Sequence, residues 1–210
     1  MTDPYRTVAE RSRSAFQIRG SEFIGHVARA ESVESAEAFI EAIEEEYSDA
    51  THNVPAYRVP SDSSEERSSD GGAMLREYAS DDGEPTGSAG KPALNVLQGQ
   101  DLQNVVIVIT RYYGGTNLGI GGLVRAYSRA TSEAIEAAGV IEEKPHQQMS
   151  LRCTYDDSGT VRGILESVGV DFEANYDETV TFEVQVPIDD VEDLEERLRS
   201  ATSGRIAIDE

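Results

Sequence analysis

The chain has 210 residues and carries 40 Asp and Glu against 18 Lys and Arg, which gives a formal net charge of −22 at pH 7. Hydrophobic residues make up 38% of it, enough for a folded core, so the composition excludes an intrinsically disordered chain. No apolar run is long enough for a membrane helix, no leader pattern opens the sequence, and the single cysteine, Cys153, excludes an internal disulfide. We expect a soluble, cytoplasmic, monomeric protein that does not bind membranes.

Strands and helices alternate in the first two thirds of the chain. Residues 1–14 form a polar lead-in, and weak alternation over 15–30 predicts one or two strands with a break near Gly20. Apolar residues at helical spacing predict a helix over 33–47, with Ser32 as its N-cap. The remaining predicted elements are a strand over 52–59, a charged loop over 61–72, a strand over 73–80, a short helix within 86–97, a buried strand over 105–110, and a long helix from about Gly121 to Gly139.

The last third has the element order β-α-β-β-α-β. Its predicted strands cover 148–155, 170–176, 180–186 and 205–208, and its predicted helices cover 161–168 and 191–201. This order is typical of the ferredoxin-like fold. We therefore expect an α+β protein with two domains, 1–143 and 147–210, divided near Lys144 and Pro145.

The basic residues are almost all arginine, since only Lys91 and Lys144 are lysine. An excess of carboxylates with so little lysine indicates a halophilic protein, adapted to multimolar salt. At that ionic strength the Debye length falls to about 3 Å or less, so self-repulsion costs little. The alternative is an acidic protein that binds basic partners.

One long stretch departs from this acidic composition. The 48 residues from Pro85 to Ser132 contain a single acidic residue, Asp101. Burial explains this for residues 105–109, but the glycine-rich loop over 114–122 is expected at the surface. Two interpretations of this stretch therefore remain open: a surface that faces an anion, and plain burial.

The segment 110–128 runs from the buried strand through glycine-rich residues into the long helix. Free N–H groups at a helix start favour an anion, and glycines let the backbone approach a phosphate. The alternative is a loop that is glycine-rich because it packs tightly, with its two tyrosines either stacking on bases or lying in the core. The candidate phosphate or nucleic-acid contacts are Lys91, Arg111, Tyr112, Tyr113, Gly114, Gly115, Gly119, Gly121, Gly122 and Arg125.

A second segment, 80–92, places three carboxylates in four residues: Asp81, Asp82 and Glu84. With His52 nearby they could form a cleft that binds Mg²⁺ and a phosphate, or that acts as acid and base. The alternative is an exposed acidic turn ahead of a helix N-cap at Thr86 or Ser88. No zinc-ligand spacing and no nucleophile motif is present, so we assign no cofactor, no metal and no catalytic residue, and we favour a non-enzymatic protein.

Four segments, in this order, resemble the YigZ/IMPACT family: 21–25 (SEFIG), 50–58 with Thr51-His52-Asn53, 80–92, and 111–128. The resemblance spans about residues 15–140, and residues 147–210 resemble the small domain that follows in prokaryotic members. It implies an N-terminal two-layer βαβ sandwich similar to a small-subunit ribosomal protein domain and to domain IV of elongation factor G, and a C-terminal domain similar to domain V of that factor. It also implies a nucleic-acid-binding cleft between segments 80–92 and 111–128.

The resemblance to this family also implies a role in translation. Eukaryotic IMPACT looks like a translational regulator, which competes for the activator of an initiation-factor kinase. The sequence departs from the family where Asn117 replaces a frequent lysine and Glu22 replaces a frequent basic residue. We expect a non-enzymatic regulator of translation whose partners are RNA or the ribosome and, beside them, a translation-related protein. The alternatives are a Mg²⁺-dependent enzyme or binder for a phosphorylated small molecule, and a protein–protein adaptor.

Overall fold

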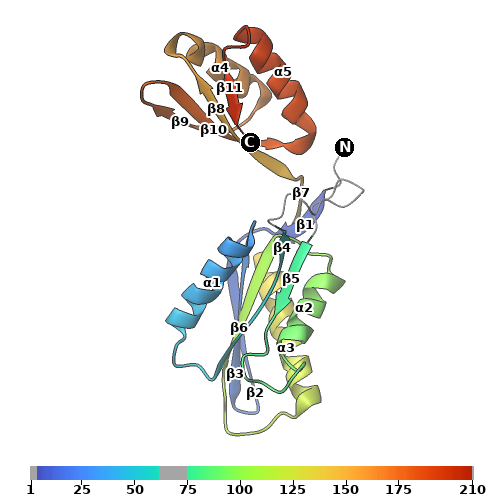
Figure 1. Ribbon diagram of the computed structural model, residues 1–210. Helices are drawn as coiled ribbons and strands as arrows, with labels where there is room; N and C mark the ends of the chain where they lie inside the picture. The colour runs from blue at the N-terminus through green and yellow to red at the C-terminus, as the bar shows by residue number, and fades with distance from the viewer. Residues whose placement is uncertain (1–3, 62–74, 210) are drawn as a thin grey trace. The chain divides into compact units, whose positions relative to one another are not determined.

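The computed structural model describes residues 4–61 and 75–209 (Figure 1). The chain divides into two compact units, Tyr5–Glu143 and a second unit that begins at Lys144. Each unit has its own hydrophobic core. The expected charged loop over 61–72 lies outside the described residues from residue 62 on.

A five-stranded antiparallel sheet forms the centre of the first unit. Its strand order is β2-β3-β6-β4-β5. The bounds are Ser12–Ile18 for β2, Ser21–Arg29 for β3, Val105–Tyr112 for β6, His52–Pro60 for β4 and Leu75–Ala79 for β5. The apolar, β-branched β6 lies in the middle because it is buried on both faces.

Helices cover both faces of this sheet (Figure 1). Helix α1 (Val33–Glu46) packs on the face that carries Val106 and Val108 of β6. Helices α2 (Gly90–Gly99) and α3 (Ile120–Ala138) pack on the opposite face, which carries Ile107 and Ile109. The unit thus has three layers instead of the two expected, because successive side chains of β6 point to opposite faces and both sets are apolar.

Two short strands were missed by the sequence pattern. Strand β1 (Tyr5–Val8) pairs antiparallel with β7 (Val140–Glu143) and joins the two ends of the first unit. Only Thr7 and Val8 of β1 are buried, so its four residues carry too little alternation to be distinguished from a polar lead-in. Strand β2 likewise begins at Ser12, inside the expected lead-in.

The second unit has the predicted element order. Strands β8, β9, β10 and β11 form an antiparallel sheet of order β11-β8-β10-β9, and α4 and α5 pack on it. Their bounds are His146–Cys153 (β8), Tyr155–Val168 (α4), Phe172–Tyr176 (β9), Val180–Pro187 (β10), Val191–Ala201 (α5) and Ala207–Asp209 (β11), with a 3₁₀ turn at Ile188–Asp190. The α+β class and the ferredoxin-like order are confirmed.

Helix α4 starts six residues before the predicted position, at Tyr155. The side chain of Asp157 in its first turn accepts hydrogen bonds from Thr154, three residues before it, and from Arg205, a distant residue that no local pattern reveals. Among the described residues, no helix is long and apolar enough to cross a membrane.

Candidate functional site

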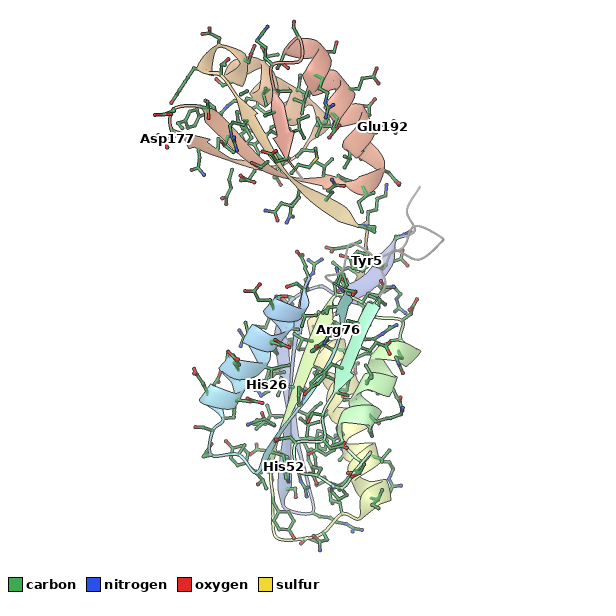
Figure 2. The ribbon with its side chains drawn as sticks, in the orientation of Figure 1. Tyr5, His26, His52, Arg76, Asp177 and Glu192 are labelled. Carbon is green, nitrogen blue, oxygen red and sulfur yellow. The ribbon has the colours of Figure 1, made fainter. Side chains whose placement is uncertain are left out.

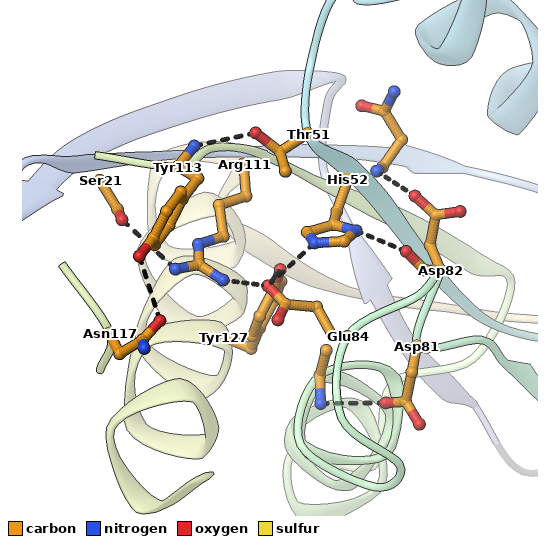
Figure 3. A network of polar contacts seen from close by, with 12 residues as sticks. Ser21, Thr51, His52, Asp81, Asp82, Glu84, Arg111, Tyr113, Asn117 and Tyr127 are labelled. Carbon is orange, nitrogen blue, oxygen red and sulfur yellow. Dashed lines mark hydrogen bonds and ion pairs between the residues drawn. The ribbon is translucent and has the colours of Figure 1, made fainter. Parts of the chain in front are cut away.

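Three strands of the first unit bring the predicted segments together at one end of the sheet. Arg111, near the end of β6, lies opposite Phe23 of β3 and opposite His52 of β4. The loop before α2 and the loop before α3 both leave the sheet at this end, so segments 80–92 and 111–128 share one site (Figure 3).

A buried carboxylate, Glu84, is the centre of this site. Its Oε1 accepts a hydrogen bond from Nη1 of Arg111 and another, 2.7 Å long, from the hydroxyl of Tyr127 on α3 (Figure 3). Arg111 is only 4% exposed and Glu84 8%. Burial, with the nearby Glu84 charge, raises the pKa of Tyr127 above its usual range, so this hydroxyl remains a donor. The ion pair therefore connects the turn that contains Glu84 to the sheet, and the Tyr127 hydrogen bond connects it to α3.

His52 extends this network towards the surface. Its Nδ1 lies 2.6 Å from the backbone carbonyl of Asp82, and a carbonyl can only accept, so Nδ1 carries the proton of that bond. Its Nε2 then faces Glu84, 3.9 Å from Oε1. The Asp82 carboxylate accepts the backbone N–H of Asn53 at 2.6 Å. His52 thus contacts the turn that contains the three predicted acids.

Asp81 caps helix α2 from outside the helix. Its carboxylate accepts the backbone N–H groups of Gly87, Ala89 and Gly90 at 2.6, 3.0 and 2.9 Å. Burial alone would raise the pKa of Asp81, but these three donors outweigh it and lower the pKa below its usual value. The expected N-cap at Thr86 or Ser88 is wrong, because the helix begins after Ala89 and Asp81 supplies the acceptor.

The three carboxylates do not form a metal site. Each has its own donors: backbone N–H groups for Asp81 and Asp82, and Arg111 with Tyr127 for Glu84. Across residues 4–61 and 75–209, no group of three or more His, Cys, Asp or Glu is placed to hold a metal ion. The idea that these acids hold Mg²⁺ is therefore not supported by their geometry.

The glycine-rich loop is fixed to the β2–β3 turn by a close backbone contact. A Cβ on Gly114 would lie 1.9 Å from the carbonyl carbon of Gly20 and 2.3 Å from the nitrogen of Ser21. Ser21 Oγ accepts the Gly114 N–H at 3.1 Å and lies 3.3 Å from Nη2 of Arg111. Only glycine fits at 114, which supports tight packing as the reason for this one glycine.

The two tyrosines of this segment have different roles. Tyr112 is half-buried and donates to Asp49 at 2.7 Å, a bond that raises the pKa of Tyr112 to about 12. Tyr113 is 44% exposed, its N–H donates to Thr51 Oγ1, and its hydroxyl donates to Asn117. Its ring lies over the Arg111 guanidinium, 5.4 Å from ring centroid to Cζ. Tyr113 alone of the pair presents an exposed ring.

Within the described part of the chain, no side chain caps the start of helix α3. Its N-cap is Gly119, with φ of 71°, and neither the cap nor any acidic residue in the first turn satisfies the free N–H groups. Gly121 and Gly122 lie in this turn, and a Cβ on Gly121 would lie 3.6 Å from Nη1 of Arg125. The exposed guanidinium of Arg125 therefore lies beside the start of the helix, where it adds to the positive end of the dipole.

The predicted cations divide into exposed and buried residues in the structure. Lys91 is exposed on the first turn of α2, and Arg125 is exposed on the second turn of α3. Arg111 is buried, and its two terminal nitrogens already have protein partners. Direct contact between Arg111 and a phosphate is therefore not supported by its position, because the buried Glu84 takes its charge. Gly115 lies in the exposed part of the loop with Gly119.

Five residues of the site had no assigned role in the sequence. They are Ser21, Thr51, Asn53, Thr110 and Tyr127, where Thr110 donates to Asn53 at 2.7 Å in the interior. All except Thr110 lie within the segments on which the family resemblance rests, so those segments were the available signal. Nothing local shows that the hydroxyl of Tyr127 reaches Glu84.

Comparison with known proteins identifies the family. The model of the Impact N-terminal domain matches residues 19–135, and a domain of unknown function, DUF1949, matches residues 151–205. The chain belongs to the IMPACT family. It is 35% identical to IMPACT family member YvyE of Bacillus subtilis over 100% of this chain and 92% of that protein. It is 31% identical to IMPACT family member YigZ of Escherichia coli, over 91% and 90% of the two chains.

Two solved structures are similar to this chain to different extents. A crystal structure of a hypothetical protein aligns with a TM-score of 0.67 and 28% identity, over 99% of this chain and 97% of the other. The two-domain translational regulator Yih1 aligns with a TM-score of 0.37 and 26% identity, over 65% of this chain and 48% of its own.

Proposed function

We propose that this IMPACT family protein is a non-enzymatic regulator of translation that binds ribosomal RNA through the exposed loop at 113–119 and the start of α3. The observation that carries the proposal is the difference between two helix starts in the same unit. The start of α2 is filled by the carboxylate of Asp81, whereas no described side chain caps the start of α3. Unfilled N–H groups at a helix start favour an anion such as an RNA phosphate.

The surroundings of α3 support the same ligand. Tyr113 offers an exposed ring on which a base can stack, and the side chain of Ile120 in the first turn is 63% exposed. Arg125 and Lys91 supply exposed positive charge within a window whose single acid, Asp101, lies 3.8 Å from Arg58. Backbone N–H groups and stacking persist in high salt better than contacts that depend only on charge.

The buried network supports a binding role over catalysis. Glu84 and Arg111 neutralise each other, and Asp81 and Asp82 accept backbone N–H groups, so these side chains hold the loops in place. Because these loops are already ordered, binding at this surface loses little conformational entropy. The alternative of a Mg²⁺-dependent enzyme has no comparable observation in its favour.

Co-sedimentation with ribosomes tests the proposal. Lys91→Ala/Arg125→Ala removes two exposed cations from the site, and Lys144→Ala/Arg197→Ala removes two exposed cations from the second unit with the same change in net charge. In dilute KCl, where charge contacts are strong, we expect the native chain and the control to pellet with ribosomes and the site variant to remain in the supernatant. If the site variant pellets like the native chain, the assignment of the surface is wrong. Arg111 is kept, because its removal would leave Glu84 buried and unpaired.

A further inference from the structure

The second unit exposes two tyrosines side by side. Tyr155 at the start of α4 is 55% exposed and Tyr176 at the end of β9 is 54% exposed, with ring centroids 6.4 Å apart. Large aromatic residues that are exposed together are uncommon on a free surface and are enriched in protein interfaces. Asp177, labelled in Figure 2, follows Tyr176 directly.

Both rings are held in fixed positions. The hydroxyl of Tyr155 donates to the backbone carbonyl of Asp177 at 2.8 Å. Arg162 of α4 donates to the hydroxyl of Tyr176, and its guanidinium lies 5.3 Å from the centroid of the Phe172 ring. Two anchored tyrosines lose little side-chain freedom when a partner covers them, which is the property of an interface anchor.

Two glycines of α4 follow Tyr155 at helical spacing. Gly159 and Gly163 are four residues apart and exposed, and a Cβ on either would meet nothing within 4 Å. A glycine inside a helix is less favourable than alanine, and no described atom lies close enough to require glycine at either position. The two glycines do let the backbone of another helix approach α4 closely along the line that starts at Tyr155.

The charge of the surface indicates which partner fits. Residues 144–210 carry six Lys or Arg against sixteen Asp or Glu, a net charge of −10. Asp156, Asp177 and Glu178 flank the two tyrosines and are exposed, while the nearby cation, Arg162, is occupied by Tyr176 and Phe172. Nucleic acid is disfavoured here, whereas arginine side chains would pair with the carboxylates and stack on the tyrosine rings.

We propose that the surface formed by Tyr155, Tyr176 and the Gly159–Gly163 face of α4 docks an arginine-rich α-helical segment of a partner protein. This surface lies on the second unit and does not depend on the RNA-binding role of the first. The partner helix lies against the two glycines, and its arginines reach the tyrosines and their flanking acids.

The test measures binding of a synthetic helical Ala/Arg peptide to the full chain, with an Ala/Glu peptide and a single-stranded RNA as other ligands. Gly159→Ala/Gly163→Ala keeps the charge, adds two methyl groups to the docking line, and removes two helix-breaking residues. We expect its thermal midpoint to rise and its affinity for the Ala/Arg peptide to fall about tenfold. Tyr155→Ala/Tyr176→Ala should weaken binding by a similar factor.

Gly99→Ala is the matched control, because Gly99 is a helical glycine with open space around it on α2 of the first unit. It should leave peptide affinity unchanged. Non-specific attraction to an acidic protein would leave the affinity of both double variants unchanged as well, and that result overturns the proposal. Three other results would also overturn the proposal: equal binding of the Ala/Glu peptide, tighter binding of the RNA, or no binding of the Ala/Arg peptide to the native chain.

Discussion

At the scale of single residues, the buried pair of Arg111 and Glu84 joins three parts of the first unit. The pair lies between β6 and the turn before α2, and the Tyr127 hydroxyl adds a bond from α3. Removing one member of a buried ion pair leaves an unpaired buried charge, which typically costs about 3–5 kcal/mol. Replacing both members with neutral groups avoids that cost.

We therefore expect Glu84→Gln and Arg111→Met each to lower the free energy of unfolding by about 3 kcal/mol or more. The double variant should lose clearly less than the two single losses combined. Urea unfolding of the four proteins, at one salt concentration, gives the coupling energy. Additive losses would show that the two charges do not depend on each other.

His26 makes the stability of the first unit depend on pH. The side chain is buried on β3, with its ring centroid 4.8 Å from that of Tyr47, and burial lowers the pKa of His26 to about 4. In the unfolded chain this group takes up its proton near pH 6.5. Between those values the unfolded state binds more protons, so stability is complete above pH 6.5 and declines as the pH falls towards 4.

We expect this group to remove at most about 3 kcal/mol of stability between pH 7 and pH 4. In His26→Gln that part of the pH dependence should be absent, although the variant is less stable at pH 7. Urea midpoints measured across this range for both proteins test it. A constant difference between the two curves would mean that His26 titrates normally in the folded protein.

At the scale of elements, Asp81 determines where α2 begins. Its carboxylate accepts the N–H groups of Ala89 and Gly90 at the helix start and that of Gly87 in the preceding turn. We expect Asp81→Ala to lower the free energy of unfolding by about 1–2 kcal/mol, the upper part of the range for loss of a cap. Asp81→Asn keeps one acceptor oxygen and should lose less.

The pH dependence of this cap has a defined direction. The pKa of Asp81 is lowered in the folded state, so its contribution is present above the unfolded pKa near 3.9 and is lost as the pH falls through the folded value. The difference in urea midpoint between native and Asp81→Ala should therefore shrink in acid. A difference that stays the same down to the lowest pH would contradict the cap.

The elements differ in how well local sequence predicts them. Helix α1 was predicted with its N-cap at Ser32, and β6 with its burial, because their apolar spacing and cap lie within a few residues. Strands β1 and β7 were missed because their pairing joins residues more than 130 positions apart. Local patterns do not contain such partners.

The same limit applies to the site. The sequence identified segments 80–92 and 111–128, and the family resemblance implied a cleft between them. Arg111 was nevertheless treated as a free cation, and the acids as an exposed turn, a metal site or an acid and base pair. The contact between Glu84 and Arg111 spans 27 residues, and the contact between Glu84 and Tyr127 spans 43. Whether a charged residue faces a ligand or another side chain is decided by such contacts, which only the fold shows.

At the scale of the whole molecule, net charge should make stability depend on salt. The chain carries −22, and exposed acids line α1. Raising KCl shortens the Debye length from about 10 Å at 0.1 M to about 3 Å at 1 M, which weakens repulsion between these groups. We expect the thermal midpoint to rise over this range. Glu37→Gln/Glu41→Gln/Glu45→Gln, which neutralises three exposed acids of α1, should reduce that rise, and an unchanged rise would contradict repulsion as its cause.

The two units should also unfold independently. Leu151 is fully buried in the core of the second unit and Ile107 in that of the first, and the two cores share no residue. Replacing a buried Leu or Ile by Ala costs about 2–5 kcal/mol. In the full chain, Leu151→Ala should therefore accelerate amide hydrogen exchange in β8 and β10 and leave the exchange of β3 and β6 unchanged, and Ile107→Ala should do the reverse.

Independent opening matters for the two proposed surfaces. The loop that precedes α3 lies on the first unit and the Tyr155–Tyr176 surface on the second, so each can be disrupted without loss of the other if the cores are uncoupled. If either variant accelerates exchange in both units to the same extent, the chain opens as one cooperative body. Variants of one surface would then need to be compared at equal stability before a loss of binding is assigned to that surface.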